Sequence, residues 1–324
     1  MANPSEKSFE VPSVLDNARL DKVVMALAEC SRAEARRLLG SGRVKVGSRV
    51  CKITAKRLKA GTKVSLIPSL LPEEAGNKTQ ETTLEIVHLD THIVVVNKPP
   101  ALLSERDRHG GPSVESILPG LIPEGAKGPR PDELWLCHRL DATTSGILML
   151  ARKSSANRKL QVAFRERTAQ KAYLAWVGGE FLGSRWVDAP IGRLKGTKHG
   201  VLENGKPSRT QIESIWSGHG VSLICARPKT GRTHQIRVHL AHLGHPILGD
   251  RLYGGLMYLP GSKMPVRRAL LHAQALCVTH PQSGKLTEYR VAPPGDFRDV
   301  SHQLSLDVDW ESLGRVKEVE ESEN

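Results

Sequence analysis

Apolar residues in the middle of the chain gather into short runs that are typical of buried strands. Residues 93–97 form one nearly continuous run, stopped by Pro99 and Pro100, and residues 147–150 form another. Proline ends such a run because it cannot donate a ladder hydrogen bond. Further strand-like segments begin near Leu84 or cover residues 134–136, 171–177 and 221–226.

Helical spacing predicts two helices among these strands. The first covers residues 155–167, and its inward face carries Leu160, Ala163 and Phe164. The second is expected to run from an N-cap at Thr233 to Gly244, with an inward face of Ile236, Leu240 and Leu243. Residues 101–133 carry many Gly and Pro and predict a long loop. Because strands and helices mix without strict alternation, we expect the α+β class, with a mixed, largely antiparallel sheet and flanking helices.

The N-terminal part predicts a separate, small α+β domain. Helical spacing relates Leu20, Val23, Val24 and Leu27, and a capping box at 31–34 opens a second helix through Leu39. A hairpin at 44–51 and a last strand ending at residue 66 follow. The predicted organisation is a small domain at 16–66, a linker at 67–83, a large domain at 84–300 and an acidic tail at 301–324.

Charge adds a function to the small domain. The formal net charge is +13, and residues 19–63 hold thirteen Lys or Arg against three acids. A basic face of this density attracts phosphate backbones or anionic membrane surfaces. The candidate contacts are Arg32, Arg36 and Arg37 on the second helix and Lys45 in the hairpin. The last 24 residues hold seven acids against two bases, and we expect a flexible tail that competes weakly for this basic face.

Other global features narrow the class of protein. Hydrophobic residues make up 39% and charged residues 25% of the chain, as in soluble globular proteins. No run approaches the roughly 18 apolar residues of a membrane span. The N-terminus has neither a signal core nor the character of a transit peptide. The five scattered cysteines form no C-x-x-C pair, and we interpret them as reduced thiols of a cytoplasmic protein.

The run 138–146, His-Arg-Leu-Asp-Ala-Thr-Thr-Ser-Gly, is the strongest candidate for chemistry. It places Asp141 beside Arg139 in a polar loop between two strand-like segments. A carboxylate in a half-buried loop costs free energy unless a cation or hydrogen-bond donors hold it. Arg237 is our candidate cation, with Arg232 as the second choice. The loop could instead be a plain turn, whose aspartate accepts backbone hydrogen bonds.

The same run resembles the HRLDxxTSG signature of the RluA-type pseudouridine synthases, and three more blocks match in the same order. They are Ile-Val-Val-Val-Asn-Lys-Pro at 93–99, Lys-Ala-Tyr-Leu-Ala-Trp-Val at 171–177, and Thr-Gly-Arg-Thr-His-Gln-Ile-Arg-Val-His-Leu at 230–240. Ordered blocks across a long stretch of chain are far more specific than one short motif. The pattern of residues 16–66 in turn resembles the S4 RNA-binding domain.

The resemblance implies site-specific isomerisation of uridine to pseudouridine in structured RNA. Asp141 would be the essential aspartate, acting by attack on the sugar or the ring or by removing the C2′ proton. Tyr173 would stack on the flipped uracil, Arg237 would hold Asp141, and Arg139 and Arg232 would bind RNA. Large-subunit ribosomal RNA is the favoured partner, ahead of transfer RNA. Since the reaction has no net redox change, we expect no cofactor and no metal; we also expect a monomer that binds no membrane.

Two alternatives of other classes stay open. An RNA-binding protein or ribosome assembly factor could keep this sequence with little or no activity, although a pure binder has no need for an aspartate among arginines. The histidines at 234, 239, 242 and 245, with Asp250 nearby, could indicate a metal-dependent hydrolase. No H-E-x-x-H motif supports the hydrolase.

Overall fold

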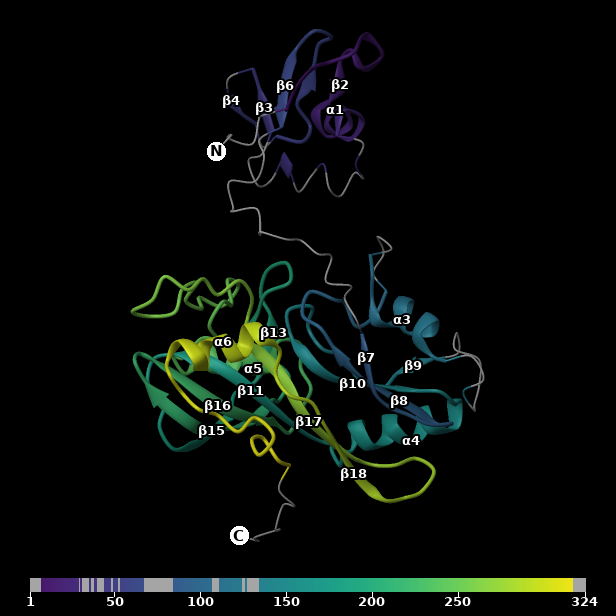
Figure 1. Ribbon diagram of the computed structural model, residues 1–324, viewed down its shortest axis with the longest axis vertical. Helices are drawn as coiled ribbons and strands as arrows, with labels where there is room; N and C mark the ends of the chain where they lie inside the picture. The colour runs from purple at the N-terminus through teal and green to yellow at the C-terminus, as the bar shows by residue number, and fades with distance from the viewer. Residues whose placement is uncertain are drawn as a thin grey trace. The chain divides into compact units, whose positions relative to one another are not determined.

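The structure is a computed structural model that describes residues 7–28, 30, 35, 38–39, 44–47, 49–51, 53–66, 84–106, 111–123, 126 and 134–316. The chain divides into two compact units, Met1–Glu81 and Thr82–Asn324 (Figure 1). Most of the second predicted helix, including Arg32, Arg36 and Arg37, lies outside the described residues. The predicted linker at 67–83 and the chain beyond residue 316 lie outside them as well.

In its described part, the smaller unit packs a helix against short strands. An antiparallel sheet has the order β1-β6-β3-β4, from β1 (Lys7–Glu10), β3 (Val44–Val46), β4 (Arg49–Val50) and β6 (Lys63–Leu66). The remaining elements are η1 (Ser13–Leu15), the paired strands β2 (Ala18–Arg19) and β5 (Arg57–Leu58), and α1 (Leu20–Leu27). Leu20, Val23 and Val24 of α1 are fully buried, so the predicted helix and hairpin are confirmed.

The larger unit is built on a ten-stranded sheet, as the predicted α+β class requires. Its main path is β12-β15-β16-β11-β17-β10-β8-β7, and β18 and β9 pair with β17 and β10 at the side of this path. All pairs are antiparallel except β10 with β17. The strands are β7 (Glu85–Leu89), β8 (Ile93–Lys98), β9 (Trp135–Leu136), β10 (Ser145–Ala151), β11 (Gln170–Gly178), β12 (Ser184–Asp188), β15 (Arg209–Gly218), β16 (Val221–Pro228), β17 (Leu271–Thr279) and β18 (Leu286–Arg290). A two-stranded sheet, β13 (Ile191–Arg193) with β14 (His199–Val201), stands apart.

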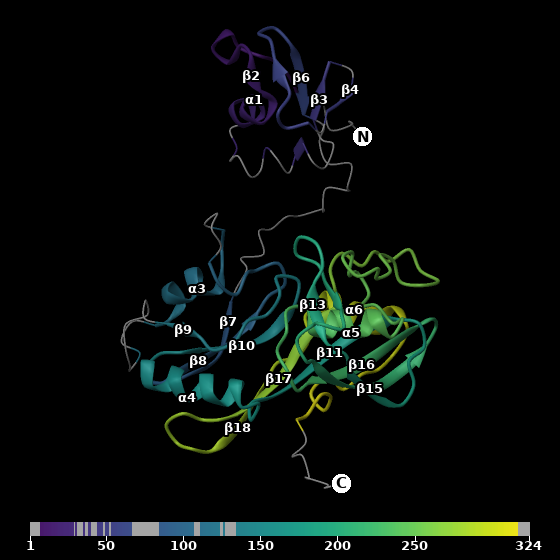
Figure 2. The ribbon, with the colours of Figure 1, turned by 180° about the vertical axis from the view of Figure 1, so that it is seen from behind.

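Both faces of the large sheet are covered, which explains its nearly continuous apolar strands. Successive residues of a strand point to opposite faces. On β11, Ala175 packs in one core with α5 (Gln235–His242) and α3 (Val114–Ile117), while Leu174 packs in another with α6 (Gly295–Gln303). A third core lies under α4 (Ser154–Arg165), which contacts β10 and β17. Figures 1 and 2 show α4 and α6 at different parts of this sheet.

Two expectations about connecting segments were wrong. The loop predicted at 101–133 contains α3 and the 3-10 helix η2 (Leu118–Leu121). The hydroxyl of Ser113 caps α3 by accepting from the Ser116 N–H, and Val114 and Leu118 reach the core. The periodicity is too short to stand out among the glycines and prolines of this segment.

The segment predicted as a flexible tail from residue 301 is also part of the core as far as residue 316. Leu304, Leu306, Val308, Trp310, Leu313 and Val316 pack on the core beside α6. Arg290 Nη2 donates to the carbonyl of Glu311 at 2.8 Å, and Gln274 Nε2 donates to that of Trp310 at 2.8 Å. The acidic composition suggested a tail, but the apolar residues of the same segment pack on the core.

None of the described helices is long and apolar enough to cross a membrane.

Candidate active site

The loop that carries Asp141 connects β9 to β10 and is closed by a tight turn. The Thr144 N–H donates to the Asp141 carbonyl at 3.0 Å. Two residues later Gly146 has φ +111° and pairs with Ala273 of the parallel strand β17. A Cβ at Gly146 would lie 2.3 Å from the Ala273 carbonyl oxygen, so only glycine fits there. The close approach of β10 and β17 therefore fixes the C-terminal end of the loop.

Lys98 holds the same loop from the core side. Its side chain is fully buried, and Nζ donates to the carbonyls of Leu102 at 2.8 Å, Pro99 at 3.0 Å and Ala142 at 3.3 Å. Burial and the charge of Arg268 lower the pKa of Lys98 to about 7, against the opposing effect of Asp141. Arg268 adds a hydrogen bond from Nη1 to the Thr143 carbonyl at 3.0 Å. The loop backbone is thus fixed by cations that bind carbonyls.

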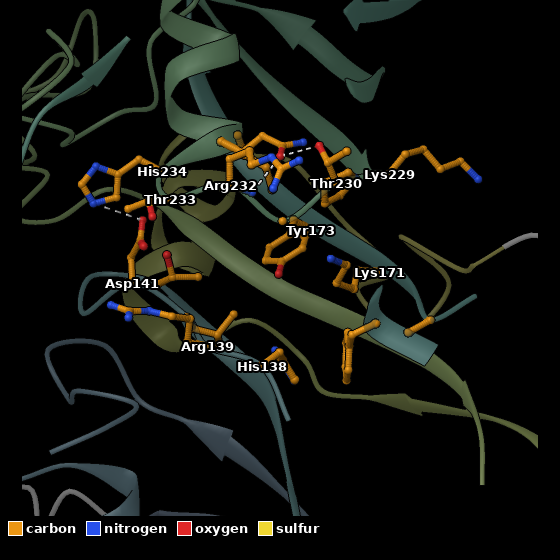
Figure 3. Close-up of a pocket in the computed structure, with 18 of the residues that line it drawn as sticks. His138, Arg139, Asp141, Lys171, Tyr173, Lys229, Thr230, Arg232, Thr233 and His234 are labelled. Carbon is orange, nitrogen blue, oxygen red and sulfur yellow. Dashed lines mark hydrogen bonds and ion pairs between the residues drawn. The ribbon is translucent and has the colours of Figure 1, made fainter. Parts of the chain in front are cut away.

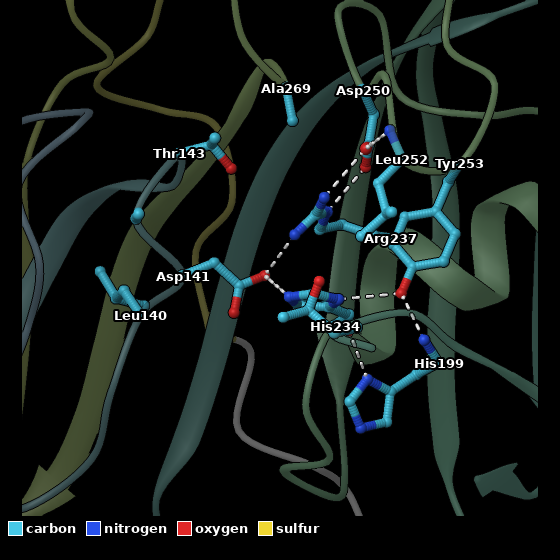
Figure 4. A network of polar contacts seen from close by, with 12 residues as sticks. Leu140, Asp141, Thr143, His199, His234, Arg237, Asp250, Leu252, Tyr253 and Ala269 are labelled. Carbon is cyan, nitrogen blue, oxygen red and sulfur yellow. Dashed lines mark hydrogen bonds and ion pairs between the residues drawn. The ribbon is translucent and has the colours of Figure 1, made fainter. Parts of the chain in front are cut away.

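Asp141 is held from the other side by Arg237 (Figure 4). Arg237 Nη1 donates to Asp141 Oδ2 at 3.1 Å, while Nε and Nη2 bind the two oxygens of Asp250 at 2.7 and 2.9 Å. Burial alone would lower the pKa of Arg237, but the hydrogen bonds and charges of Asp250 and Asp141 raise it well above its usual range. Among the described residues Asp141 Oδ1 has no hydrogen-bond partner. One oxygen of Asp141 is therefore oriented and the other is left available.

The helix that carries Arg237 begins differently from the prediction. Its N-cap is His234, in the left-handed region at φ +57°, and Thr233 does not cap it. The turn before α5 is tied instead by Gln235, whose Oε1 accepts from the Thr230 hydroxyl at 2.7 Å and from the Arg232 N–H at 3.0 Å. Gly244, at φ +83°, follows the last residues of the helix as expected. The prediction missed this arrangement because the side chain that ties the turn, Gln235, is the first residue of the helix and not the residue before it.

His234 adds a neutral donor beside Asp141. The Tyr253 hydroxyl accepts from the His199 N–H at 3.1 Å and lies 2.8 Å from His234 Nδ1. The Tyr253 hydroxyl therefore donates its proton to His234 Nδ1. This assigns the proton of the neutral His234 ring to Nε2, which lies 3.8 Å from Asp141 Oδ2. Burial lowers the pKa of His234, opposed by the charge of Asp141, so the imidazole is neutral near pH 7.

A pocket of about 480 Å³ opens on this network (Figure 3). Tyr173 of β11 is buried in its wall, and burial together with the charge of Asp141 raises the pKa of its hydroxyl far above neutrality. The phenol is therefore a neutral flat wall at every physiological pH. Other polar residues that line the pocket include His138, Arg139, Lys171, Lys229, Thr230, Arg232 and His234.

The structure brings most of the predicted site residues to this pocket. Asp141, Tyr173 and Arg237 all line it, and the predicted contact between Arg237 and Asp141 is present. Arg232 also lines the pocket, but its Nε binds the Pro207 carbonyl at 3.1 Å rather than Asp141. Arg139 is 68% exposed and pairs with Glu105 at 2.5 Å. Lys45 lies on β3 of the other unit.

Sequence reasoning missed the groups that orient these side chains. Asp250, only 1% exposed, was weighed solely as a metal ligand, yet it binds Arg237 in a bidentate pair. Tyr253 was not singled out, and Lys98 entered only as a member of the matching block at 93–99, with no role assigned to it. A buried lysine that binds carbonyls leaves no local pattern, because its partners are backbone atoms. Only the short spacing from Asp250 to Tyr253, in a glycine-rich segment after α5, offered a signal.

The histidines do not converge on a metal site. Both ring nitrogens of His239 are used, by the Thr210 hydroxyl at 2.8 Å and the Ala189 carbonyl at 3.0 Å, and His245 Nδ1 binds the Gly178 carbonyl. Within the described ranges the donors that do converge are His88, Asp90 and His280, none of which belongs to the predicted set. His280 Nδ1 accepts from the Gln282 and Ser283 N–H groups, so its Nε2 carries a proton toward Asp90. The histidines on which the metal-dependent hydrolase was based therefore do not form a metal site within the described residues.

Taken together, the geometry presents a carboxylate oxygen to a pocket with an aromatic wall. The carboxylate is oriented by a guanidinium, and no second acid among the described residues contacts it. Such a group can attack an electrophilic carbon or remove a proton from a bound molecule. The cations that line the pocket, among them the exposed Arg139, suit a ligand with phosphate groups.

Comparisons with known proteins agree with this chemistry. A family model described as RNA pseudouridylate synthase matches residues 92–242, and the S4 domain model matches residues 18–64. The chain is 38% identical to ribosomal large subunit pseudouridine synthase C of Vibrio vulnificus (strain CMCP6), over 80% of this chain and 84% of that protein. It is 33% identical to synthase D of the same organism, over 97% and 99% of the two chains. Among solved structures, human RNA pseudouridylate synthase domain containing 4 matches with a TM-score of 0.56 and 28% identity, over 69% of this chain and 94% of that one.

Proposed function

This chain belongs to the RluA-type family of RNA pseudouridylate synthases, and from that premise we propose that it isomerises specific uridines of large-subunit ribosomal RNA, with Asp141 as its catalytic residue. The ribosomal substrate is suggested by the names of the relatives, and transfer RNA is the second candidate. The same relatives argue against a binder without activity.

The observation that carries the catalytic assignment is the arrangement of the two Asp141 oxygens. Oδ2 is bound by Arg237 (Figure 4), whereas Oδ1 has no hydrogen-bond partner among the described residues, and Asp141 lines the same pocket as Tyr173 (Figure 3). The reaction breaks the N1–C1′ bond of a uridine, turns the uracil and forms a C5–C1′ bond. Attack by Oδ1 on the sugar or the ring, or removal of the C2′ proton by Oδ1, would start this sequence.

The remaining site residues prepare the uridine for that step. A base must leave its stack to reach Oδ1, which costs a few kcal/mol. We assign Arg139 to the RNA at the point where the uridine leaves, because it is exposed and lines the pocket. Tyr173 would stack on the flipped uracil, and Arg232 would bind a phosphate at the rim. These groups would offset part of the cost of extrusion.

The smaller unit would supply affinity rather than chemistry. It matches the S4 domain and carries Lys45, for which we propose a phosphate contact. The assignments of Arg32, Arg36 and Arg37 to RNA stay predictions. We propose a monomeric, cytoplasmic enzyme that binds no membrane. Burial raises the pKa of Cys137 to about 12 and of Cys225 to about 11, which suits unreactive thiols in a reducing compartment.

The test of catalysis is pseudouridine mapping of total RNA from cells that lack this protein, rescued with wild type or with Asp141→Ala. We expect one or more sites to vanish without the protein and to return only with wild type. The purified Asp141→Ala variant should bind RNA almost as well as wild type, because affinity resides mainly in phosphate contacts. Asp188→Ala, which removes an exposed acid, is the matched control. Rescue by Asp141→Ala would contradict the assignment.

The test of the smaller unit is deletion of residues 1–66. Each lost phosphate contact should remove about 0.7–0.9 from the slope of log affinity against log salt concentration. We therefore expect weaker RNA binding with a flatter salt dependence, and a retained rate of chemistry at saturating RNA. An unchanged slope would mean that this unit does not lie on the RNA.

A further inference from the structure

Lys171 of β11 is a cation in the pocket to which the proposed reaction gives no role. Its side chain is partly buried, and it lines the pocket two residues before Tyr173. Within the part of the chain that the structure describes, its ammonium group makes no hydrogen bond and no ion pair. Burial alone lowers the pKa of Lys171 to about 8, so no carboxylate compensates its charge. A cation kept in this state costs folding free energy, which suggests that a ligand completes it.

The surroundings of Lys171 leave room for that ligand. The titratable side chain that Lys171 influences in the pocket, His138, is neutral, because burial and Lys171 lower the pKa of the imidazole to about 3. His138 Nε2 is already used as an acceptor by the Met149 N–H. Gly231 also lies near Lys171, because a Cβ built on it would be 3.9 Å from Lys171 Nζ. A glycine there leaves the space beside the ammonium open.

Position relative to the reacting group identifies the atom that Lys171 meets. Residues 171 and 173 of a strand point to the same face, and in Figure 3 Tyr173 lies between Asp141 and Lys171. The charge of Asp141 affects the pKa of Tyr173 but is not a cause of the shift at Lys171. A uridine with C1′ at Asp141 and its ring along Tyr173 therefore turns the far edge of the uracil toward Lys171. The group opposite N1 on that edge is the C4 carbonyl.

We propose that Lys171 is a catalytic residue that donates a hydrogen bond to a uracil carbonyl oxygen, O4 in the substrate and O2 after the ring has turned. The inference rests on the proposed function of the pocket. Turning the uracil about its N3–C6 axis exchanges N1 with C5 and C4 with C2. The same ammonium group therefore meets a carbonyl oxygen before and after the rotation.

The contact has consequences for both rate and selectivity. When the N1–C1′ bond breaks, its electron pair stays on the ring, and the negative charge is shared by N1, O2 and O4. A positive donor at O4, and later at O2, stabilises this anion until C5 bonds to C1′ and loses its proton. Cytosine carries an amino group where uracil has O4, and an ammonium group repels that donor. Lys171 would therefore also discriminate against cytidine.

A phosphate fits this position less well than a carbonyl. Phosphates stay on the RNA backbone, and the cation best placed to meet them is Arg139, which lines the pocket and is 68% exposed. Lys171 lies beside Tyr173, on the wall along which the base would stack. The two ligands also differ in an experiment, because loss of a phosphate contact weakens RNA binding and flattens its salt dependence.

The experiment compares wild type, Lys171→Met and Lys171→Arg on a synthetic RNA that carries the mapped uridine. We expect Lys171→Met to lower the single-turnover rate by about 10²–10³-fold, as loss of a donor to a developing anion does, with RNA affinity and salt slope unchanged. Lys171→Arg should retain most of the rate. Lys285→Met, which changes an exposed lysine before β18, is the matched control. Lys171→Met should unfold at the same temperature as wild type or higher, since it removes an uncompensated charge.

Two readouts separate catalysis from a structural role. The pH dependence of kcat/KM reports the pKa values of groups in the free enzyme. We expect kcat/KM of wild type to fall near pH 8, where Lys171 loses its proton, and kcat/KM of Lys171→Arg not to fall up to pH 9. 4-Thiouridine at the target, which replaces O4 by a weak acceptor, should slow wild type but not slow Lys171→Met further. A wild-type rate in Lys171→Met, or an equal 4-thiouridine penalty in both enzymes, would overturn the proposal. Weaker binding with an unchanged rate would assign Lys171 to a phosphate instead. A wild-type enzyme that forms no pseudouridine would overturn the proposed function itself.

Discussion

Arg237 and Lys98 both hold the loop of Asp141, one from the pocket and the other from the core. Arg237 binds two carboxylates, and their charges raise its pKa above the usual range. Lys98 binds three neutral carbonyls, and burial lowers its pKa to about 7. A carboxylate compensates a buried cation fully, whereas carbonyl dipoles do so only in part. The pocket side of the loop therefore keeps a permanent charge, while the core side holds the backbone with a charge that depends on pH.

The largest effect on the rate is expected from a change on the pocket side of the loop, where Arg237 pairs with both Asp141 and Asp250. Asp250→Asn keeps the shape of the side chain but places an amide donor against the Arg237 guanidinium. We expect Arg237 to shift, Asp141 to lose its orientation and the single-turnover rate to fall roughly 10²-fold, as small misplacements near a reacting group do. The free energy of unfolding should fall by at most about 3 kcal/mol, the lower end for a broken buried pair, because Asp141 still pairs with Arg237.

Asp188→Asn is the matched control for this prediction. It makes the same change at an exposed aspartate, 3.9 Å from Arg209. We expect neither its rate nor its stability to change measurably. If Asp250→Asn behaved in the same way, the pair with Asp250 would not be what orients Arg237.

A smaller, pH-dependent effect is expected on the core side. The pKa of Lys98 is about 7 in the folded protein and near 10.5 when unfolded. Between these values the unfolded chain binds more protons, so the contribution of Lys98 to stability should rise with pH. Each pKa unit corresponds to about 1.4 kcal/mol, and we expect the difference in unfolding free energy between wild type and Lys98→Met to grow by a few of these steps from pH 7 to pH 10.

Urea unfolding at several pH values measures this difference. Lys159→Met is the control, because Lys159 is exposed and donates to one carbonyl, that of Pro281 at 2.7 Å. It shows the effect of removing a lysine that donates to a carbonyl at the surface. A difference for Lys98→Met that does not change with pH would show that the carbonyls compensate the buried charge as fully as a carboxylate would.

The smallest effect is expected at the exposed cation of the same loop. Arg139 and Glu105 are 68% and 50% exposed, so their ion pair is screened by water. Glu105→Gln should change the free energy of unfolding by less than about 1 kcal/mol and should slightly increase RNA affinity at low salt, because Arg139 is then released to phosphate. Urea unfolding and filter binding at two salt concentrations test this. A large loss of stability would mean that the pair is part of the framework that holds Asp141.

The sequence by itself determined the features that depend on short-range pattern. Apolar runs and helical spacing gave the strands, the helices and the α+β class, and ordered blocks gave the family, the Asp141 loop and the arginine that contacts it. These succeed because alternation and helical periodicity act between near neighbours in the chain. The predicted N-cap of α5 at Thr233 was wrong. The turn before this helix is held by Gln235, which donates to the Arg209 carbonyl and the Thr210 hydroxyl of β15, and a local pattern does not contain these contacts.

Tertiary structure decided what surrounds the reacting group. Arg237 meets Asp250 only because the chain folds back after α5, and Lys98 binds carbonyls of the backbone. The fold likewise decides that the ammonium group of Lys171 has no partner among the described residues. The segment 301–316 shows the same limit, because its acidic residues pointed to a tail while its apolar ones pack on the sheet. Composition records how many charges a segment carries, but only the folded chain decides which of its side chains are removed from water.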